Sequence, residues 1–178
     1  MRNQNTGSDR GIRPGRETDA FKKLKGLSDD VVLNLLKKKL KSVGLTGEPG
    51  SASESGPGRK LSEVLLAFIE PHLRHAETEE VLDGLVSTAA LAWNASLLPE
   101  DKREEFLDEA GQAILTEAGK QAADDFRPIM RDLIKRKQRL FPKDECVVVS
   151  YELRKVHGRD QLVVASVRSV SCDIKESD

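Results

Sequence analysis

The sequence predicts a mainly α fold of the α+β class, a small helical bundle capped by two antiparallel strands in a C-terminal β-hairpin. Apolar residues recur at helical spacing through residues 60–139, and the pattern then changes to two Val-rich runs, CVVVSYEL and QLVVASVRS. Aromatic residues make up only 4% of the chain, so the core must be built mostly from aliphatic side chains. The 178 residues suit one domain.

The first 59 residues are predicted to hold one helix between two flexible stretches. Residues 1–18 are polar without periodicity and are expected to be disordered. Residues 19–43 are interpreted as an accessory basic helical segment. Ser28 is the predicted cap of its helix, and Gly44 is the predicted stop. Residues 44–59, GLTGEPGSASESGPGR, read as a flexible linker. The sequence leaves open whether the accessory helix docks on the main domain.

The main domain is predicted to span residues 60–170, followed by a polar tail at residues 171–178. Pro71 should kink or stop its first helix near Glu70, because proline lacks an N–H group and clashes with the preceding turn. Thr78 is the predicted cap of a long second helix. Pro99 cannot continue that helix but can begin the next one.

The stretch LAWNASLLPE, residues 91–100, contains the single tryptophan of the chain. Trp93 follows Ala89 by about one turn, which predicts a core anchor rather than a ligand platform. The glycosylation triplet that starts at Asn94 lies in a helical pattern and is interpreted as chance. Asn94 and Ser96 are expected to bond the carbonyl groups at the helix end.

Two further helices and a hairpin complete the predicted domain. Gly119 should separate the helices, and Pro128 lies either near the start of the last helix or at a kink within it. That helix should end before LFP, residues 140–142, and KVHGRD with Gly158 should form the hairpin turn. A lone hairpin is marginal in water, so it must pack on the helices or pair its edge with another strand. This leaves a homodimer through the hairpin edge open.

The sequence favours a cytoplasmic protein without membrane contact. No apolar run approaches the roughly 20 residues that span a bilayer, and the N-terminus lacks the apolar core of a secretory signal. The two cysteines, Cys146 and Cys172, are expected to be reduced thiols, although a disulfide between them stays open if their strands pair.

Charge is distributed in three blocks along the chain. Residues 1–60 hold 13 basic and 7 acidic residues (net +6), residues 61–125 hold 4 and 15 (net −11), and residues 126–178 hold 12 and 8 (net +4). The basic segments either dock on the acidic helices of the same chain or meet an external polyanion.

The densest basic segment, RDLIKRKQRLFPK at residues 131–143, is the candidate binding site for nucleic acid or a partner. It contains Arg131, Lys135, Arg136, Arg139 and Lys143. Arg131, Lys135 and Arg139 are four residues apart and therefore share one helix face that could contact phosphates. The alternative is an amphipathic helix with a solvated basic outer face.

Signals for other chemistry are weak. His72 and His75 are spaced for one helix face, but zinc needs three or four convergent ligands, so we expect no metal. The loop GPGRKLS lacks the G-K-[ST] ending of a phosphate-binding loop, and no catalytic motif appears. No cofactor is therefore expected.

The segments AWNASLLPE and IKRKQRLFP, followed by a Val-rich hairpin ending in LVVAS, resemble a group of small uncharacterised bacterial proteins over roughly residues 60–168. The resemblance implies a bacterial origin and implies that residues 60–168 form one unit, and it carries no activity.

From the charge layout and the absence of a catalytic motif, we expect a non-enzymatic interaction or regulatory module with a protein partner. Nucleic-acid association through residues 131–143 is the alternative, and an enzyme ranks third.

Overall fold

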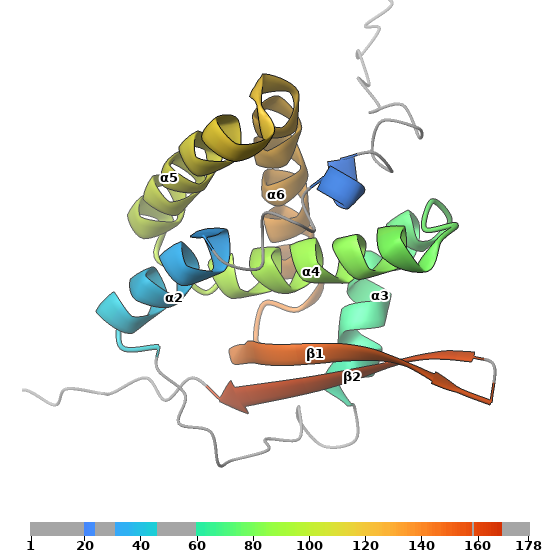
Figure 1. Ribbon diagram of the computed structural model, residues 1–178. Coiled ribbons are helices and arrows are strands. Elements are labelled where there is room, and N and C mark those ends of the chain that lie inside the picture. The colour runs from blue at the N-terminus through green and yellow to red at the C-terminus, as the bar shows by residue number, and fades with distance from the viewer. Residues whose placement is uncertain (1–19, 24–30, 46–59, 158, 169–178) are drawn as a thin grey trace, which may run out of the picture.

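The computed structural model describes residues 20–23, 31–45, 60–157 and 159–168 (Figure 1). Over these ranges it confirms the α+β class, since five long helices precede one antiparallel hairpin. They are α2 (Leu33–Ser42), α3 (Leu61–Leu73), α4 (Glu79–Ala95), α5 (Glu100–Ala118), α6 (Lys120–Leu140), β1 (Cys146–Val156) and β2 (Arg159–Arg168). The predicted disorder at residues 1–18, the predicted cap Ser28, nearly all of the linker, Cys172 and the predicted tail lie outside the described residues.

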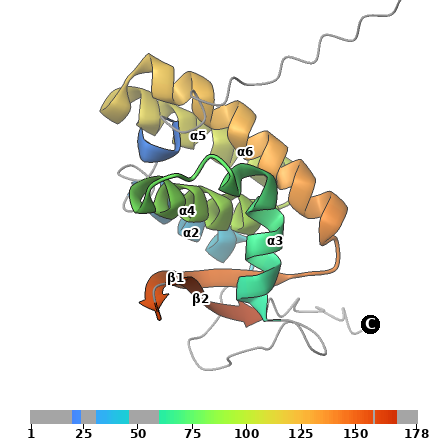
Figure 2. The same ribbon diagram turned by 90° about the vertical axis from the view of Figure 1, so that its right-hand side faces the viewer.

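The helices and the hairpin form three levels. In Figure 1, α5 and α6 form the upper level, α4 and α2 the middle level, and the hairpin the lower level, while α3 descends from α4 to the hairpin. The view in Figure 2 shows the same order from the side. Helix α4 is therefore central, and it touches α2, α3, α6 and β1.

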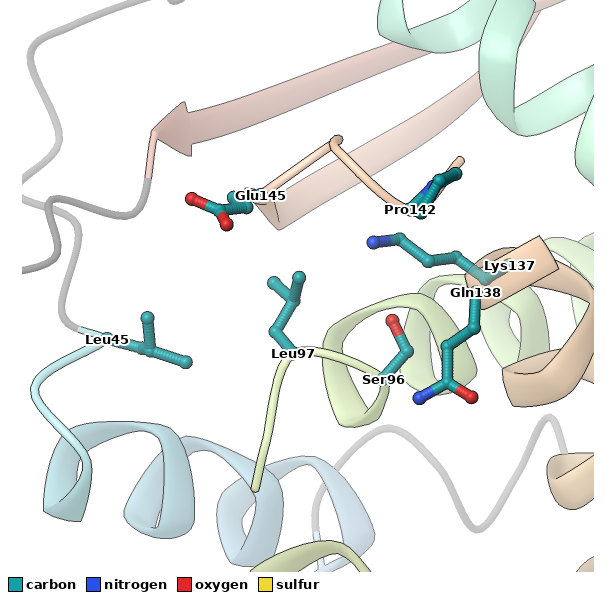
Figure 3. Close-up of a pocket in the computed structure, with 7 residues that line it drawn as sticks. All are labelled: Leu45, Ser96, Leu97, Lys137, Gln138, Pro142 and Glu145. Carbon is teal, nitrogen blue, oxygen red and sulfur yellow. The ribbon is translucent and has the colours of Figure 1, made fainter. Parts of the chain in front are cut away.

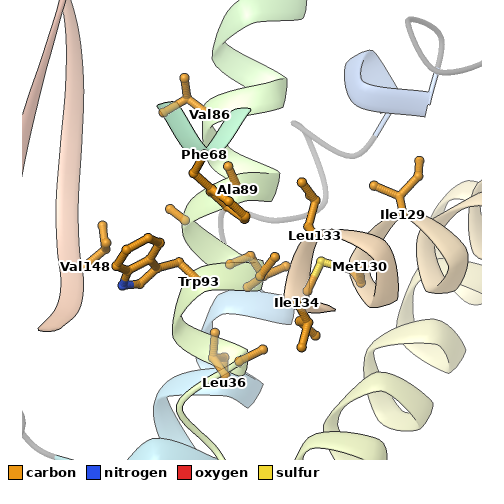
Figure 4. Close-up of a cluster of buried hydrophobic side chains, with 14 of the residues drawn as sticks. Leu36, Phe68, Val86, Ala89, Trp93, Ile129, Met130, Leu133, Ile134 and Val148 are labelled. Carbon is orange, nitrogen blue, oxygen red and sulfur yellow. The ribbon is translucent and has the colours of Figure 1, made fainter. Parts of the chain in front are cut away.

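Helix α4 is buried on all sides over its second half. All residues from 84 to 95 are buried, as expected for a helix that runs through a core. Trp93 is fully buried and lies edge-to-face against Phe68, with ring centroids 5.8 Å apart (Figure 4). The prediction that Trp93 is a core anchor is confirmed. Ala89 and Ala92 are also fully buried, and their small side chains permit close approach of neighbouring helices.

Helix α2 belongs to the same core. Leu36 and Leu40 are buried among the residues of the main domain. The Lys39 ammonium group lies 3.1 Å from a carboxylate oxygen of Glu105 and 3.0 Å from one of Glu109, both on α5. The segment described from sequence as accessory thus contributes packing and ion pairs to the bundle.

Helix α3 continues past Pro71. The sequence predicted a kink or a stop near Glu70, and the stop is wrong because the helix runs on to Leu73. Proline has no N–H group to donate to the carbonyl four residues earlier, which is that of Ala67. A guanidinium group from α6 reaches these carbonyls instead: Arg136 Nη2 donates to Ala67 O at 3.3 Å and Nε donates to Phe68 O at 2.7 Å. These bonds stabilise the turn that the proline would otherwise weaken.

Other predicted helix boundaries agree with the structure, although α6 ends at Leu140, one residue later than predicted. The Thr78 hydroxyl oxygen accepts a hydrogen bond from the Val81 backbone N–H at 3.3 Å and caps α4. Pro99 precedes the first residue of α5, and Gly119 separates α5 from α6 with a φ of 84°, a conformation that favours glycine. Pro128 lies inside α6 rather than near its start, because the helix already begins at Lys120.

The hairpin forms as predicted and packs on α3 and α4. Val156 pairs with Arg159 next to the turn, and Leu153 pairs with Leu162 further along the strands. A bulge between Val148 and Ser150 interrupts the register and leaves Val149 half exposed. The strands therefore cover the core with one face and present the other face to solvent.

Candidate functional site

The stretch LAWNASLLPE joins the central helix to the hairpin. The Trp93 indole Nε1 donates a hydrogen bond to the backbone oxygen of Cys146 at 2.8 Å, across 53 residues of sequence. Trp93 is therefore tied to the first residue of β1 as well as packed in the core. Ser96 Oγ donates to Trp93 O at 2.6 Å, which confirms the predicted bond to a helix-end carbonyl.

Asn94 has a role that the sequence prediction missed. Its Nδ2 donates to Val148 O and its Oδ1 accepts from Val148 N, both at 2.8 Å. The side-chain amide thus bonds β1 as the backbone of a neighbouring strand would, instead of bonding the helix-end carbonyls. Asn94 is only 4% exposed, and both ends of its amide are engaged.

One cation of the basic segment and one that precedes it are paired with acids of the same chain. Arg131 Nη2 lies 2.7 Å from Glu104 Oε2, and Arg127 Nη2 lies 2.7 Å from Asp108 Oδ1. Both pairs join α6 to the acidic α5. Together with Arg136, which bonds the carbonyls of α3, they support docking of basic segments on acidic helices of the same chain.

Four of the five predicted site residues are exposed, and three of these four lack an ion pair in the described part of the chain. Lys135, Arg139 and Lys143 form no ion pair with any residue in the described ranges. Lys135 and Arg139 are four residues apart on α6, and Lys143 follows just after the helix. The structure therefore separates the predicted row into Arg131 and Arg136, which hold the bundle together, and a shorter row of three exposed cations.

Lys137 is buried in the middle of this basic segment, although the sequence prediction did not select it. It is 3% exposed, its Nζ donates to Asp144 O at 2.6 Å, and the ammonium group lies 5.0 Å from the centroid of the Trp93 ring. Burial lowers the pKa of Lys137 below its ordinary value, against the opposing effect of Asp144, Glu145 and Cys146. The sequence signal for its burial was its position three residues after the buried Ile134, which places both residues on the same face of α6.

A pocket of about 330 Å³ opens beside Lys137 (Figure 3). Its apolar walls come from Leu45, Leu97 and Pro142. Its polar lining residues are Lys137, Glu145, Ser96 and Gln138. Helix α6, the loop before β1, the turn after α4 and the end of α2 therefore meet at one concave site.

The two histidines do not assemble a metal site in the described part of the chain. The His72 ring lies edge-on to Phe21 with centroids 6.0 Å apart, and His75 Nε2 accepts a hydrogen bond from Arg74 Nε at 3.0 Å. No three His, Cys, Asp or Glu side chains converge among residues 20–23, 31–45, 60–157 and 159–168.

Over the same ranges, no helix has both the length and the apolar character needed to cross a bilayer.

Comparison with known proteins adds no relative. No protein-family model, no curated protein and no solved structure matches the chain.

Proposed function

We propose that this chain is a non-catalytic protein-interaction module and that the outer edge of β2 is its contact surface. The partner we propose is a second copy of the chain, which would add its own β2 and extend the two-stranded hairpin to a four-stranded sheet. The observation that carries the proposal is an edge strand whose residues 161–167 contain no charge and no proline, in a sheet of only two described strands.

The hydrogen-bonding groups of the hairpin support this choice of edge. Val148 of β1 directs its N–H and C=O away from β2, because both groups bond Asn94. Val148 pairs with Ser166, so the alternation of an antiparallel pair directs the N–H and C=O groups of Ser166, Val164 and Leu162 away from β1. No other described strand pairs with that side of β2.

The residues of the edge also favour association. Natural sheets protect an edge with lysines, prolines or bulges, and residues 161–167, QLVVASV, contain no charge and no proline. The single bulge lies in β1. Val163 is 37% exposed and lies on the solvent face with Ala165, which adds apolar area next to the open backbone groups.

A second copy of the chain can bond the outward N–H and C=O groups of β2 with the same groups of its own β2. Antiparallel pairing of β2 with itself around a twofold axis near Val164 uses the same patch on both molecules, as in most dimers. The chain has a formal net charge of −1, so two copies repel each other little.

Light scattering coupled to gel filtration tests the proposal. We expect the full chain to have twice the monomer mass at micromolar concentrations and Val163→Lys to be monomeric. Val163 pairs with the exposed Glu152, so the introduced lysine meets an opposite charge and leaves the hairpin folded. The matched control is Leu115→Lys, which changes a similarly exposed apolar residue on α5 and should stay dimeric.

A monomeric wild type over the whole concentration range would contradict the proposal. A dimer that Val163→Lys and Leu115→Lys weaken equally would place the interface elsewhere.

The exposed cations Lys135, Arg139 and Lys143 support a second candidate function, association with a nucleic-acid backbone. Gel-shift titrations of duplex DNA should then show sequence-independent binding, with a log–log salt slope of about −3 for three phosphates. Changing the three residues to Gln should abolish the shift. Arg131→Gln is the matched control, because Arg131 already pairs with Glu104. Absence of a shift at low salt would remove this candidate.

A further inference from the structure

The pocket beside Lys137 presents opposite charges and an apolar wall to the same small volume. Lys137 and Glu145 both line it, and their charged groups do not form an ion pair with each other. In Figure 3 the two side chains lie on opposite sides of Leu97. Leu45 and Pro142 complete the apolar part of the wall.

The Lys137 ammonium group has donor capacity left for a ligand. It carries three N–H groups, and one of them bonds Asp144 O. The Trp93 ring lies beneath the ammonium group and holds it in place. No carboxylate lies within ion-pair distance of this buried cation among the described residues, so a carboxylate of a ligand would give it its missing partner.

A ligand of one charge sign fits the pocket poorly. A simple anion would gain from Lys137 but would be repelled by Glu145 and Asp144, which are near enough to act on the Lys137 ammonium. A simple cation would gain from Glu145 but would face Lys137. A zwitterion can place each of its charges beside the opposite one.

We propose that this pocket binds a free amino acid with an apolar side chain. Its carboxylate accepts hydrogen bonds from Lys137, its ammonium group pairs with Glu145, and its side chain lies against Leu45, Leu97 and Pro142. The volume of about 330 Å³ is at the small end of the usual range for ligand pockets, which suits a ligand of this size better than a nucleotide or a lipid. The inference is independent of the proposed dimer.

Titration of the full chain with L-leucine tests the inference by two measurements. Trp93 is the single tryptophan and lies against the Lys137 ammonium, so its emission should change saturably as leucine binds. Isothermal calorimetry gives the affinity independently. We expect 4-methylpentanoate, which lacks the ammonium group, and 3-methylbutylamine, which lacks the carboxylate, to bind at least about tenfold more weakly than leucine.

Two variants separate recognition from folding. Glu145→Gln changes an exposed residue and should weaken leucine binding about tenfold without weakening the binding of 4-methylpentanoate. Lys137→Met keeps the length of the side chain over Trp93 and should remove the preference for ligands with a carboxylate, with circular dichroism as the check on its fold. Lys135→Met is the matched control, since Lys135 is exposed on α6 and does not line the pocket.

Three results would overturn the inference. They are the absence of a saturable signal in both measurements, equal affinity for leucine and 4-methylpentanoate, and leucine binding that is unchanged in both Glu145→Gln and Lys137→Met.

Discussion

Replacing Asn94 by alanine tests the joint between α4 and the hairpin. The substitution removes two hydrogen bonds of 2.8 Å and leaves the N–H and C=O groups of Val148 without partners. Asn94 is 4% exposed and Val148 is 6% exposed, so water does not readily replace the amide. A buried polar group left unpaired costs about 1–3 kcal/mol, and two such groups predict a loss of about 2–4 kcal/mol once the hairpin shifts to admit some water.

Asn94→Asp makes the test more specific. One carboxylate oxygen can still accept from Val148 N–H, but the other then faces the Val148 carbonyl oxygen, and a charge is buried without a partner. We therefore expect Asn94→Asp to be at least as unstable as Asn94→Ala. Asn34→Ala is the matched control, because Asn34 is exposed on α2 and its loss should change stability by no more than about 0.5 kcal/mol.

Urea unfolding, followed by circular dichroism and by Trp93 emission, measures these differences in the free energy of unfolding. Hydrogen exchange should also show loss of protection at the Val148 amide in Asn94→Ala. The reasoning fails if Asn94→Ala is as stable as Asn34→Ala and the Val148 amide stays protected.

Three further predictions concern the contacts between helices. Leu36→Ala should lower the free energy of unfolding by about 2–5 kcal/mol, and an unchanged stability would mean that α2 is accessory, as its sequence suggested. Arg136→Met should lower the free energy of unfolding by about 1–3 kcal/mol, and by less in a chain where Pro71→Ala restores the missing N–H. Additive effects in this double-mutant cycle would contradict the link between the two residues. The pKa of Glu105 lies below its ordinary value of 4.5, mainly because Lys102 donates a hydrogen bond to its carboxylate and also because Lys39 does. These contacts stabilise the folded chain above pH 4.5, and their contribution is lost as the pH falls through the folded pKa. The acid-induced loss of stability in a pH series of urea titrations should be smaller in Glu105→Gln.

The sequence predicted the parts of the fold that depend on local pattern. The apolar stripe through Trp93, the cap Thr78, the helix boundary at Gly119 and the Val-rich hairpin each depend on a few neighbouring residues. Such signals act through periodicity and backbone preference, which a single sequence displays directly.

The contacts that the sequence did not predict join distant segments. Arg136 looked like part of a basic binding row, yet it bonds Phe68 O, 68 residues away, and Ala67 O, the carbonyl that Pro71 leaves unpaired. Asn94 is paired with a strand 54 residues away. Lys137 looked like one cation among several, yet it is buried and its ammonium group lies over the Trp93 ring. Residue type alone does not distinguish a solvated cation from one that completes a tertiary hydrogen bond.

The joint at Trp93 and Asn94 also constrains the order in which the chain folds. Both of its contacts close loops of more than 50 residues, whereas α5 and α6 are successive helices separated by Gly119 and meet after a short search. Because closing a longer loop has a higher entropic cost, the α5–α6 pair should form early and the hairpin should dock late. During synthesis, the end of α4 leaves the ribosome well before the residues of β1 that cover it. Until β1 arrives, Trp93 lacks that cover, so a newly made chain exposes an apolar surface there that favours aggregation.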